Sequence, residues 1–162
     1  MANYQTHTKF NICIALPIFL LIFFLFLQPP LFGLLLFSLS FVYSTLFMNP
    51  DVDVSYKIRI FSLRGILTLP FRMYCLFFRH RGLSHSFMYG SLTRIVWLFG
   101  CFLFILYISH KTLPTLPDCI SFLCRYKVSL SYIFAGICLA DWCHLLLAVS
   151  YTHLRAHETR HD

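Results

Sequence analysis

The sequence predicts an all-α membrane protein with about four transmembrane helices, plus interfacial helices in residues 54–79. Three observations lead to this. The chain is 59% hydrophobic and only 12% charged, whereas soluble domains carry about 25% charged residues. Long apolar runs alternate with short polar segments, and Lys and Arg gather in some of those segments only. This composition excludes a soluble monomer, a disordered chain and a small secreted domain held by disulfides, because none of these can bury so much apolar surface.

Four apolar stretches are candidates for membrane spans. A helix needs about 20 apolar residues to cross about 30 Å of hydrocarbon. The first stretch ends where Gln28 is followed by two prolines, which cannot continue a helix. The last stretch contains an Asp and a His in an otherwise apolar run. The expected spans are Phe10–Leu27, Leu31–Met48, Ile95–Ser109 and Val128–Leu147.

The stretch Phe61–Phe78 is apolar but is interrupted by Arg64, Pro70 and Arg72. A charge at the bilayer centre costs at least about 2.5 kcal/mol. We therefore expect helices that lie in the membrane interface, with the arginines toward the headgroups.

The distribution of basic residues predicts the orientation of the chain. Cytoplasmic loops of membrane proteins are enriched in Lys and Arg. One predicted side carries Lys9, Lys57, Arg59, Arg64, Arg72, Arg79, Arg81 and Arg94, and the other carries Lys111, Arg125 and Lys127. This asymmetry predicts a membrane protein with a cytoplasmic N-terminus. Topology thus explains the net charge of +7. Nucleic acid is not an expected partner, because no nucleic-acid-binding motif is present.

Residues 149–162 differ in composition from the rest of the chain. The stretch is rich in His and polar after Leu154, and VSYTHLRAHET resembles a translated sequencing adapter. Such foreign segments are excluded from fold reasoning. We expect residues 1–148 to form a single multi-pass membrane domain cut short at its C-terminus, and residues 149–162 to be an artefactual tail.

Asp51 and Asp53 directly follow the second predicted span. On an extended backbone, residues two apart project to the same side, which suits a metal site. The alternative is a helix cap or turn, where Asp is common. No Glu occurs before the tail, and the remaining carboxylates there are Asp118 and Asp141.

His80 and His85 lie in the motif HRGLSHS. On an ideal helix they would point about 140° apart, but a loop around Gly82 can bring both imidazoles to one ion. Arg81 offers a planar donor fork for phosphate or carboxylate. The alternative is a basic loop whose histidines have no ligand.

Asp141 and His144 lie in the fourth predicted span and share a helix face. Ionisable residues inside a span are functional candidates. The alternative is a buried pair that only fixes helix packing. His7 precedes the first span and is, taken alone, an ordinary tail histidine.

Topology places all these residues on the cytoplasmic side, and it places His110 and Asp118 on the opposite side. We therefore predict a metal site formed by His7, Asp51, Asp53, His80, His85, Asp141 and His144. Mixed imidazole and carboxylate donors suit Zn, Mn, Fe or Ni. The number of donors allows two ions, or one ion with supporting residues.

The segments NPDVD, HRGLSHS, GSLTR and LADWCHLLL resemble a family of bacterial membrane proteins described as metal-binding and of uncharacterised function. They are more distantly similar to inner-membrane proteins described as metal-dependent hydrolases. The resemblance covers about residues 7–147. It implies a location in the bacterial inner membrane and a metal site at the seven residues named above.

The function expected first is that of a multi-pass membrane protein with a cytoplasm-facing metal site. A candidate activity for it is hydrolysis of an ester or phosphoester, with a lipid-linked or phosphorylated substrate. The ion would activate water, Asp53 or Asp141 would act as general base, and Arg81 would hold an anionic group. The alternative is a non-enzymatic metal-binding protein for sensing, storage or structural clamping. The partner common to both is the lipid bilayer.

Overall fold

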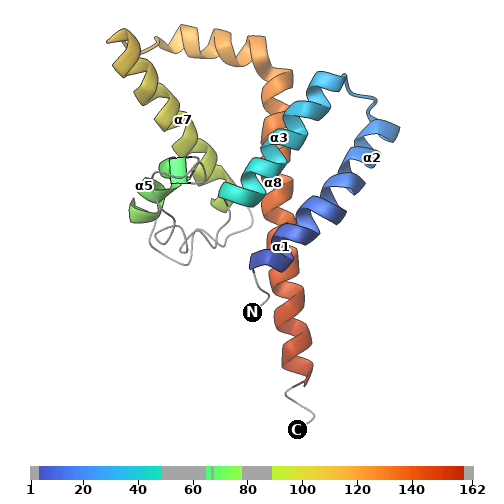
Figure 1. Ribbon diagram of the computed structural model, residues 1–162. Helices are drawn as coiled ribbons and strands as arrows, with labels where there is room; N and C mark the ends of the chain where they lie inside the picture. The colour runs from blue at the N-terminus through green and yellow to red at the C-terminus, as the bar shows by residue number, and fades with distance from the viewer. Residues whose placement is uncertain (1–3, 49–64, 67, 78–88, 159–162) are drawn as a thin grey trace.

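The computed structural model describes residues 4–48, 65–66, 68–77 and 89–158, and within them the chain is all-helical, as predicted. Short turns join α2 to α3 and α7 to α8, and Figure 1 labels most of the helices. In chain order the helices are α1 (Tyr4–Phe10), the π-helix η1 (Asn11–Ala15), α2 (Leu16–Phe26), α3 (Leu31–Phe47), α5 (Leu69–Phe77), α7 (Tyr89–His110) and α8 (Leu116–Glu158).

The direction of the long helices alternates between the two ends of a bundle (Figure 1). The turns after α2 and after α7 lie at the upper end in that view. The N-terminus, the end of α3, the start of α7 and the C-terminal part of α8 point to the opposite end, here called the lower end. This alternation is the one that the four apolar stretches predict.

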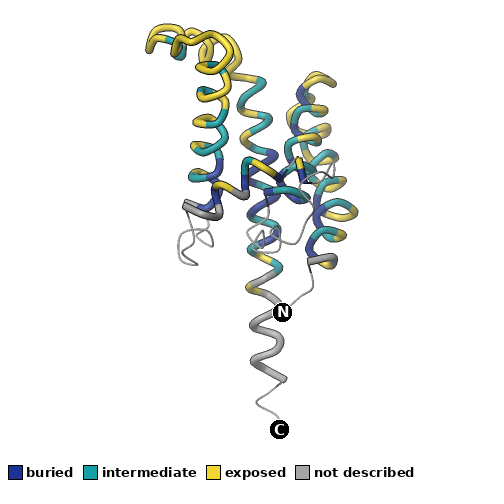
Figure 2. Tube along the Cα trace, turned by 60° about the vertical axis from the view of Figure 1, so that its left-hand side comes forward, coloured by how far each residue is buried: buried dark blue, intermediate teal, exposed yellow. Residues whose placement is uncertain are grey.

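Within the described residues, three helices are long and apolar enough to cross a membrane, rather than the four expected. They are Thr6–Phe26, Gly90–His110 and Leu116–Leu147. Helix α3 has 17 residues and is about 26 Å long, so the second predicted span falls short of a full crossing. Figure 2 shows exposed positions along the outer faces of the helices. Many of them are large apolar side chains, such as Phe24 and Ile105.

Helix α8 starts earlier than predicted and is longer than one crossing. The segment 116–127, expected as part of a loop, is helical. Thr115 begins the helix: its backbone N–H and its hydroxyl both donate to Asp118 Oδ2, at 3.0 and 2.5 Å, an N-terminal cap. The first part of α8 crosses the upper end of the bundle, and the rest turns down beside α3 (Figure 1).

The core lies where α3 packs against α8. Phe37 and Phe41 of α3 are fully buried, together with Ala15 and Ala140. Gly136 of α8 lies directly against α3, because a Cβ there would be 2.7 Å from the carbonyl oxygen of Phe37. Small residues at such a crossing let two helix backbones approach closely.

Gly136→Ala should therefore destabilise the protein by about 1–3 kcal/mol, the usual cost of overpacking. The control is Gly100→Ala on α7, where an added Cβ meets nothing within 4 Å. That change should be neutral or stabilising by up to about 1 kcal/mol, because Ala favours helix over Gly. Thermal unfolding in one detergent compares the two. Equal melting temperatures would contradict the close α3–α8 contact.

Helix α5 is hydrogen-bonded to the N-terminal part of α7. The Trp97 indole N–H donates to the Pro70 carbonyl at 2.8 Å, and the Tyr74 hydroxyl is 2.8 Å from that of Thr93. Phe71 and Tyr74 pack with Met48 at the end of α3. Helix α5 falls within the predicted interfacial segment, and residues 54–64 lie outside the described part.

Candidate metal centre

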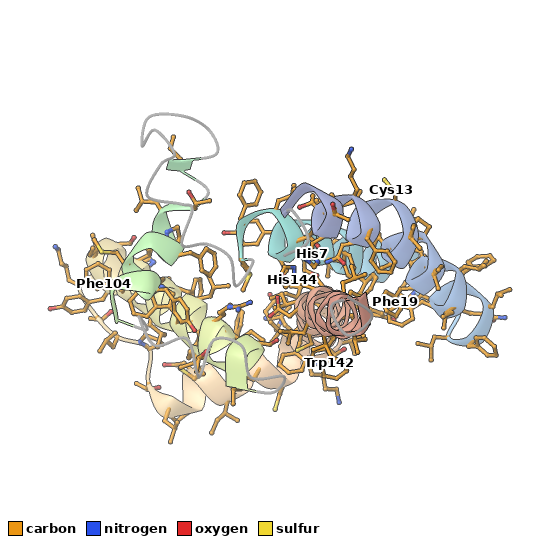
Figure 3. All side chains as sticks on the ribbon, turned by 90° about the horizontal axis from the view of Figure 1, so that it is seen from below. His7, Cys13, Phe19, Phe104, Trp142 and His144 are labelled. Atoms are coloured by element: carbon orange, nitrogen blue, oxygen red, sulfur yellow. The ribbon has the colours of Figure 1, made fainter. Side chains whose placement is uncertain are left out.

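Two histidines from opposite ends of the sequence meet inside the bundle. The rings of His7 on α1 and His144 on α8 have their centroids 4.4 Å apart and their planes tilted by 44°. Each residue is only 5% exposed. Seen from below in Figure 3, the two side chains lie together between the N-terminal helix and α8. The structure therefore brings together two of the predicted ligands.

Asn11 holds the N-terminal helix against its neighbours near this pair. Its side-chain amide Nδ2 donates to the carbonyl oxygen of Ala140 at 3.1 Å and to the hydroxyl of Thr45 at 3.3 Å. Asn11 also opens the π-helical turn η1, a rare geometry that is frequent at functional sites. His7 lies one helical turn before Asn11, so the same contacts hold His7 close to α8.

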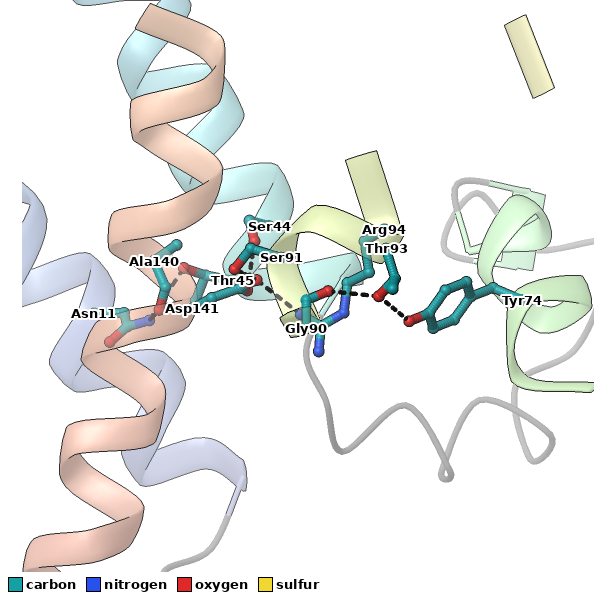
Figure 4. A network of polar contacts seen from close by, with 10 residues as sticks. All are labelled: Asn11, Ser44, Thr45, Tyr74, Gly90, Ser91, Thr93, Arg94, Ala140 and Asp141. Atoms are coloured by element: carbon teal, nitrogen blue, oxygen red, sulfur yellow. Dashed lines mark hydrogen bonds and ion pairs between the residues drawn. The ribbon is translucent and has the colours of Figure 1, made fainter. Parts of the chain in front are cut away.

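Asp141 is held by donors from two other helices (Figure 4). Its Oδ2 accepts from Ser91 at 2.7 Å and from Arg94 Nη1 at 2.9 Å, and its Oδ1 accepts from Ser44 at 3.1 Å. Arg94 and Asp141 form an ion pair and both are buried. This network joins α3, α7 and α8 one turn away from His144.

Arg94, Ser91, Ser44 and Asn11 are the residues that sequence reasoning missed. The sequence suggests a basic loop for Arg94, but the residue lies in the first turns of α7 and faces Asp141. The signal available was its place beside an apolar run, in a chain with few carboxylates to pair with. For Asn11 the signal was a single amide inside an apolar span.

The remaining predicted site residues lie outside the described part of the chain. These are Asp51, Asp53, His80, Arg81 and His85. Along the sequence, the described part stops before these residues at Met48 and Phe77, and it resumes at Gly65 and Tyr89. The ends of α3 and α7 that border these segments lie at the lower end (Figure 1). His110 and Asp118, which the prediction excluded, border the turn at the upper end.

The donors that are described fit part of a site for a divalent transition ion. Two neighbouring imidazoles are typical ligands of such ions. Asn11 Oδ1 and Thr8 Oγ1 are buried oxygens with no hydrogen-bond partner among the described residues. In that part of the chain, no three His, Cys, Asp or Glu residues gather to hold an ion. Further protein ligands would therefore have to come from other segments.

A family model described as "Uncharacterized metal-binding protein (DUF2227)" matches residues 2–158, nearly the whole chain. No curated protein and no solved structure matches this chain.

Proposed function

The chain belongs to this family of uncharacterized metal-binding proteins, and from that premise we propose a multi-pass membrane protein that binds one or two divalent transition-metal ions. The site is at the lower end of the bundle. The observation that carries the proposal is the buried contact between the rings of His7 and His144. Ionisable side chains are rare inside an apolar helix bundle, and where two imidazoles from distant parts of a sequence meet there, they usually have a functional role.

We propose that His7 and His144 are ligands together with Asp51, Asp53, His80 and His85. The chemistry of the sequence supports the last four, because imidazole and carboxylate are the usual donors to Zn, Mn, Fe and Ni. The described chain also enters their segments beside this site: Met48 packs on Phe71 and Ile137, and Ser91 hydrogen-bonds to Asp141.

In this proposal Asp141 supports the site rather than binding the ion. Both of its oxygens already accept hydrogen bonds, and its charge is matched by Arg94. Groups behind metal ligands commonly orient them in this way. Asp141 fixes the turn of α8 that carries His144.

The membrane setting is part of the proposal. Three helices are long and apolar enough to cross a bilayer, and their outer faces carry exposed apolar side chains that lipid would cover. The excess of Lys and Arg before residue 95 favours a cytoplasmic lower end. A bacterial inner membrane fits this charge pattern.

The experiment that tests the proposal is the metal content of the detergent-purified chain, measured by plasma mass spectrometry. We expect one or two transition-metal ions per chain after metal supplementation. A His80→Ala/His85→Ala variant should lose most of this metal because it lacks two proposed ligands. A folded, supplemented parent without metal would contradict the proposal.

The finer proposal is a hydrolase for an ester or phosphoester, such as a lipid-linked phosphate. When bound, the metal would polarise the substrate and activate water. Asp141 is already paired with Arg94, so in this finer proposal Asp53 is the spare carboxylate that acts as general base while the other proposed ligands hold the ion. Arg81 would bind the anionic group.

Turnover separates hydrolysis from metal sensing, storage or clamping. The metal-loaded chain should cleave a chromogenic phosphodiester. Asp53→Asn should reduce the rate by about 100-fold or more, since general-base catalysis contributes about 10²–10⁴-fold. Metal binding without cleavage of phosphodiester, phosphomonoester or carboxylic ester substrates would favour a non-enzymatic role.

A further inference from the structure

The side chain of Asn11 is fixed in one orientation within the core. Its Nδ2 donates to the Ala140 carbonyl at 3.1 Å and to Thr45 Oγ1 at 3.3 Å. A carbonyl oxygen can only accept a hydrogen bond, so the nitrogen must face Ala140 and the oxygen must face away. Figure 4 shows the amide oxygen pointing away from Ala140.

This fixed oxygen is buried and has no donor of its own. Asn11 is 2% exposed, and its Oδ1 has no hydrogen-bond partner among the described residues. Thr8 Oγ1, three residues earlier on the same side of the helix, is likewise buried and has no hydrogen-bond partner among the described residues. A buried carbonyl without a partner is costly, so native structures normally supply a donor or a cation.

Asn11 lies one helical turn from each histidine of the pair. His7 is four residues before Asn11, and residues at this spacing share a helix face. Ala140, which Asn11 contacts on α8, is one turn before His144. The ring centroids of the two histidines are 4.4 Å apart. Asn11 thus lies one turn after His7 along the N-terminal helix, and it contacts α8 one turn before His144.

From this geometry we propose that Asn11 is a further ligand of the metal site and binds the ion through Oδ1. The inference rests on the proposed metal-binding function. Oxygen donors of this kind favour Mn²⁺, whereas imidazole favours Zn²⁺. Asn11 therefore contributes to the choice of metal as well as to affinity.

The test compares Mn²⁺ and Zn²⁺ dissociation constants of the detergent-purified full chain and its Asn11→Leu variant. Leu has similar volume but no oxygen. We expect the Mn²⁺ affinity to fall by about tenfold or more, and the Zn²⁺ affinity to fall less, because loss of a single polar partner of a site typically costs about 10–100-fold. Thr45→Val is the control: it removes one bond to Nδ2 and leaves Oδ1, so both affinities should stay unchanged.

Three results would overturn the inference while leaving the proposed function intact. The first is an Asn11→Leu variant that binds both ions as tightly as the parent. The second is an Asn11→Leu variant that loses equal affinity for Mn²⁺ and Zn²⁺. The third is a Thr45→Val variant that loses as much affinity as Asn11→Leu. If Asn11→Leu does not fold, Asn11→Asp decides. It retains an oxygen and adds a charge, so it should bind Mn²⁺ at least as tightly as the parent, and weaker binding by a folded variant overturns the inference. A parent that binds neither ion contradicts the proposed function itself.

Discussion

Arg94→Met should destabilise the folded protein by about 3–5 kcal/mol, the cost of removing one partner of a buried ion pair. Arg94 and Asp141 are 3% and 5% exposed, and their charged atoms are 2.9 Å apart. Without the guanidinium, the Asp141 carboxylate stays in the core with only two serine hydroxyls. Thermal or denaturant unfolding of the detergent-solubilised protein measures the effect.

Two controls separate loss of the pair from loss of a positive charge. Arg125→Met removes an exposed arginine on α8 whose guanidinium lies 5.8 Å from the centre of the Tyr126 ring, and should change stability by about 0.5 kcal/mol or less. Arg94→Met/Asp141→Leu removes both buried charges and should recover much of the loss, since apolar replacements of whole buried pairs are often tolerated. Arg94→Met as stable as Arg125→Met would contradict the network.

His7→Ala and His144→Ala should each weaken metal binding by more than about 100-fold. Partners behind a ligand already contribute about 10–100-fold, and we propose that these residues bind the ion directly. The stability of the apo protein should change much less, because the two imidazoles contribute little to the apolar core. A competition titration of Zn²⁺ against a chromogenic chelator measures the affinities.

His110→Ala is the matched control for this prediction. His110 lies at the end of α7 and is exposed, on the side of the bundle away from His7 (Figure 1). Its removal should leave the affinity unchanged. If all three variants bind equally, the histidine pair is a packing contact and the ligands lie elsewhere.

The helical architecture was predictable because apolar runs of membrane length leave few other folds. Helix boundaries were less so. The sequence of residues 116–127 has no apolar period typical of a span, yet it is helical because Thr115 and Asp118 cap it and it continues directly into the rest of α8. Helix α3 was expected to be a full span, but it ends at Phe47 with 17 residues.

The candidate site was predictable where topology alone determines position. His7 lies near the start of α1, and His144 lies in the part of α8 that runs down toward the lower end. The alternation of helices therefore brings them together. Contacts that depend on helix rotation were not predictable: nothing in the sequence specifies that Arg94 and Ser91 turn toward Asp141. The assignments of Asp51, Asp53, His80, Arg81 and His85, and of residues 149–162 as a foreign tail, stay predictions.

The most direct test of the central claim is X-ray absorption spectroscopy of the Zn²⁺-loaded, detergent-purified chain and of its His7→Ala/His144→Ala variant. We predict imidazole scattering from the parent, with Zn–N distances of about 2.0–2.1 Å. The variant, loaded at high Zn²⁺, should show two fewer imidazoles or no specific shell. An identical ligand shell in the two proteins, or a parent shell without imidazole, would contradict a metal site built on His7 and His144.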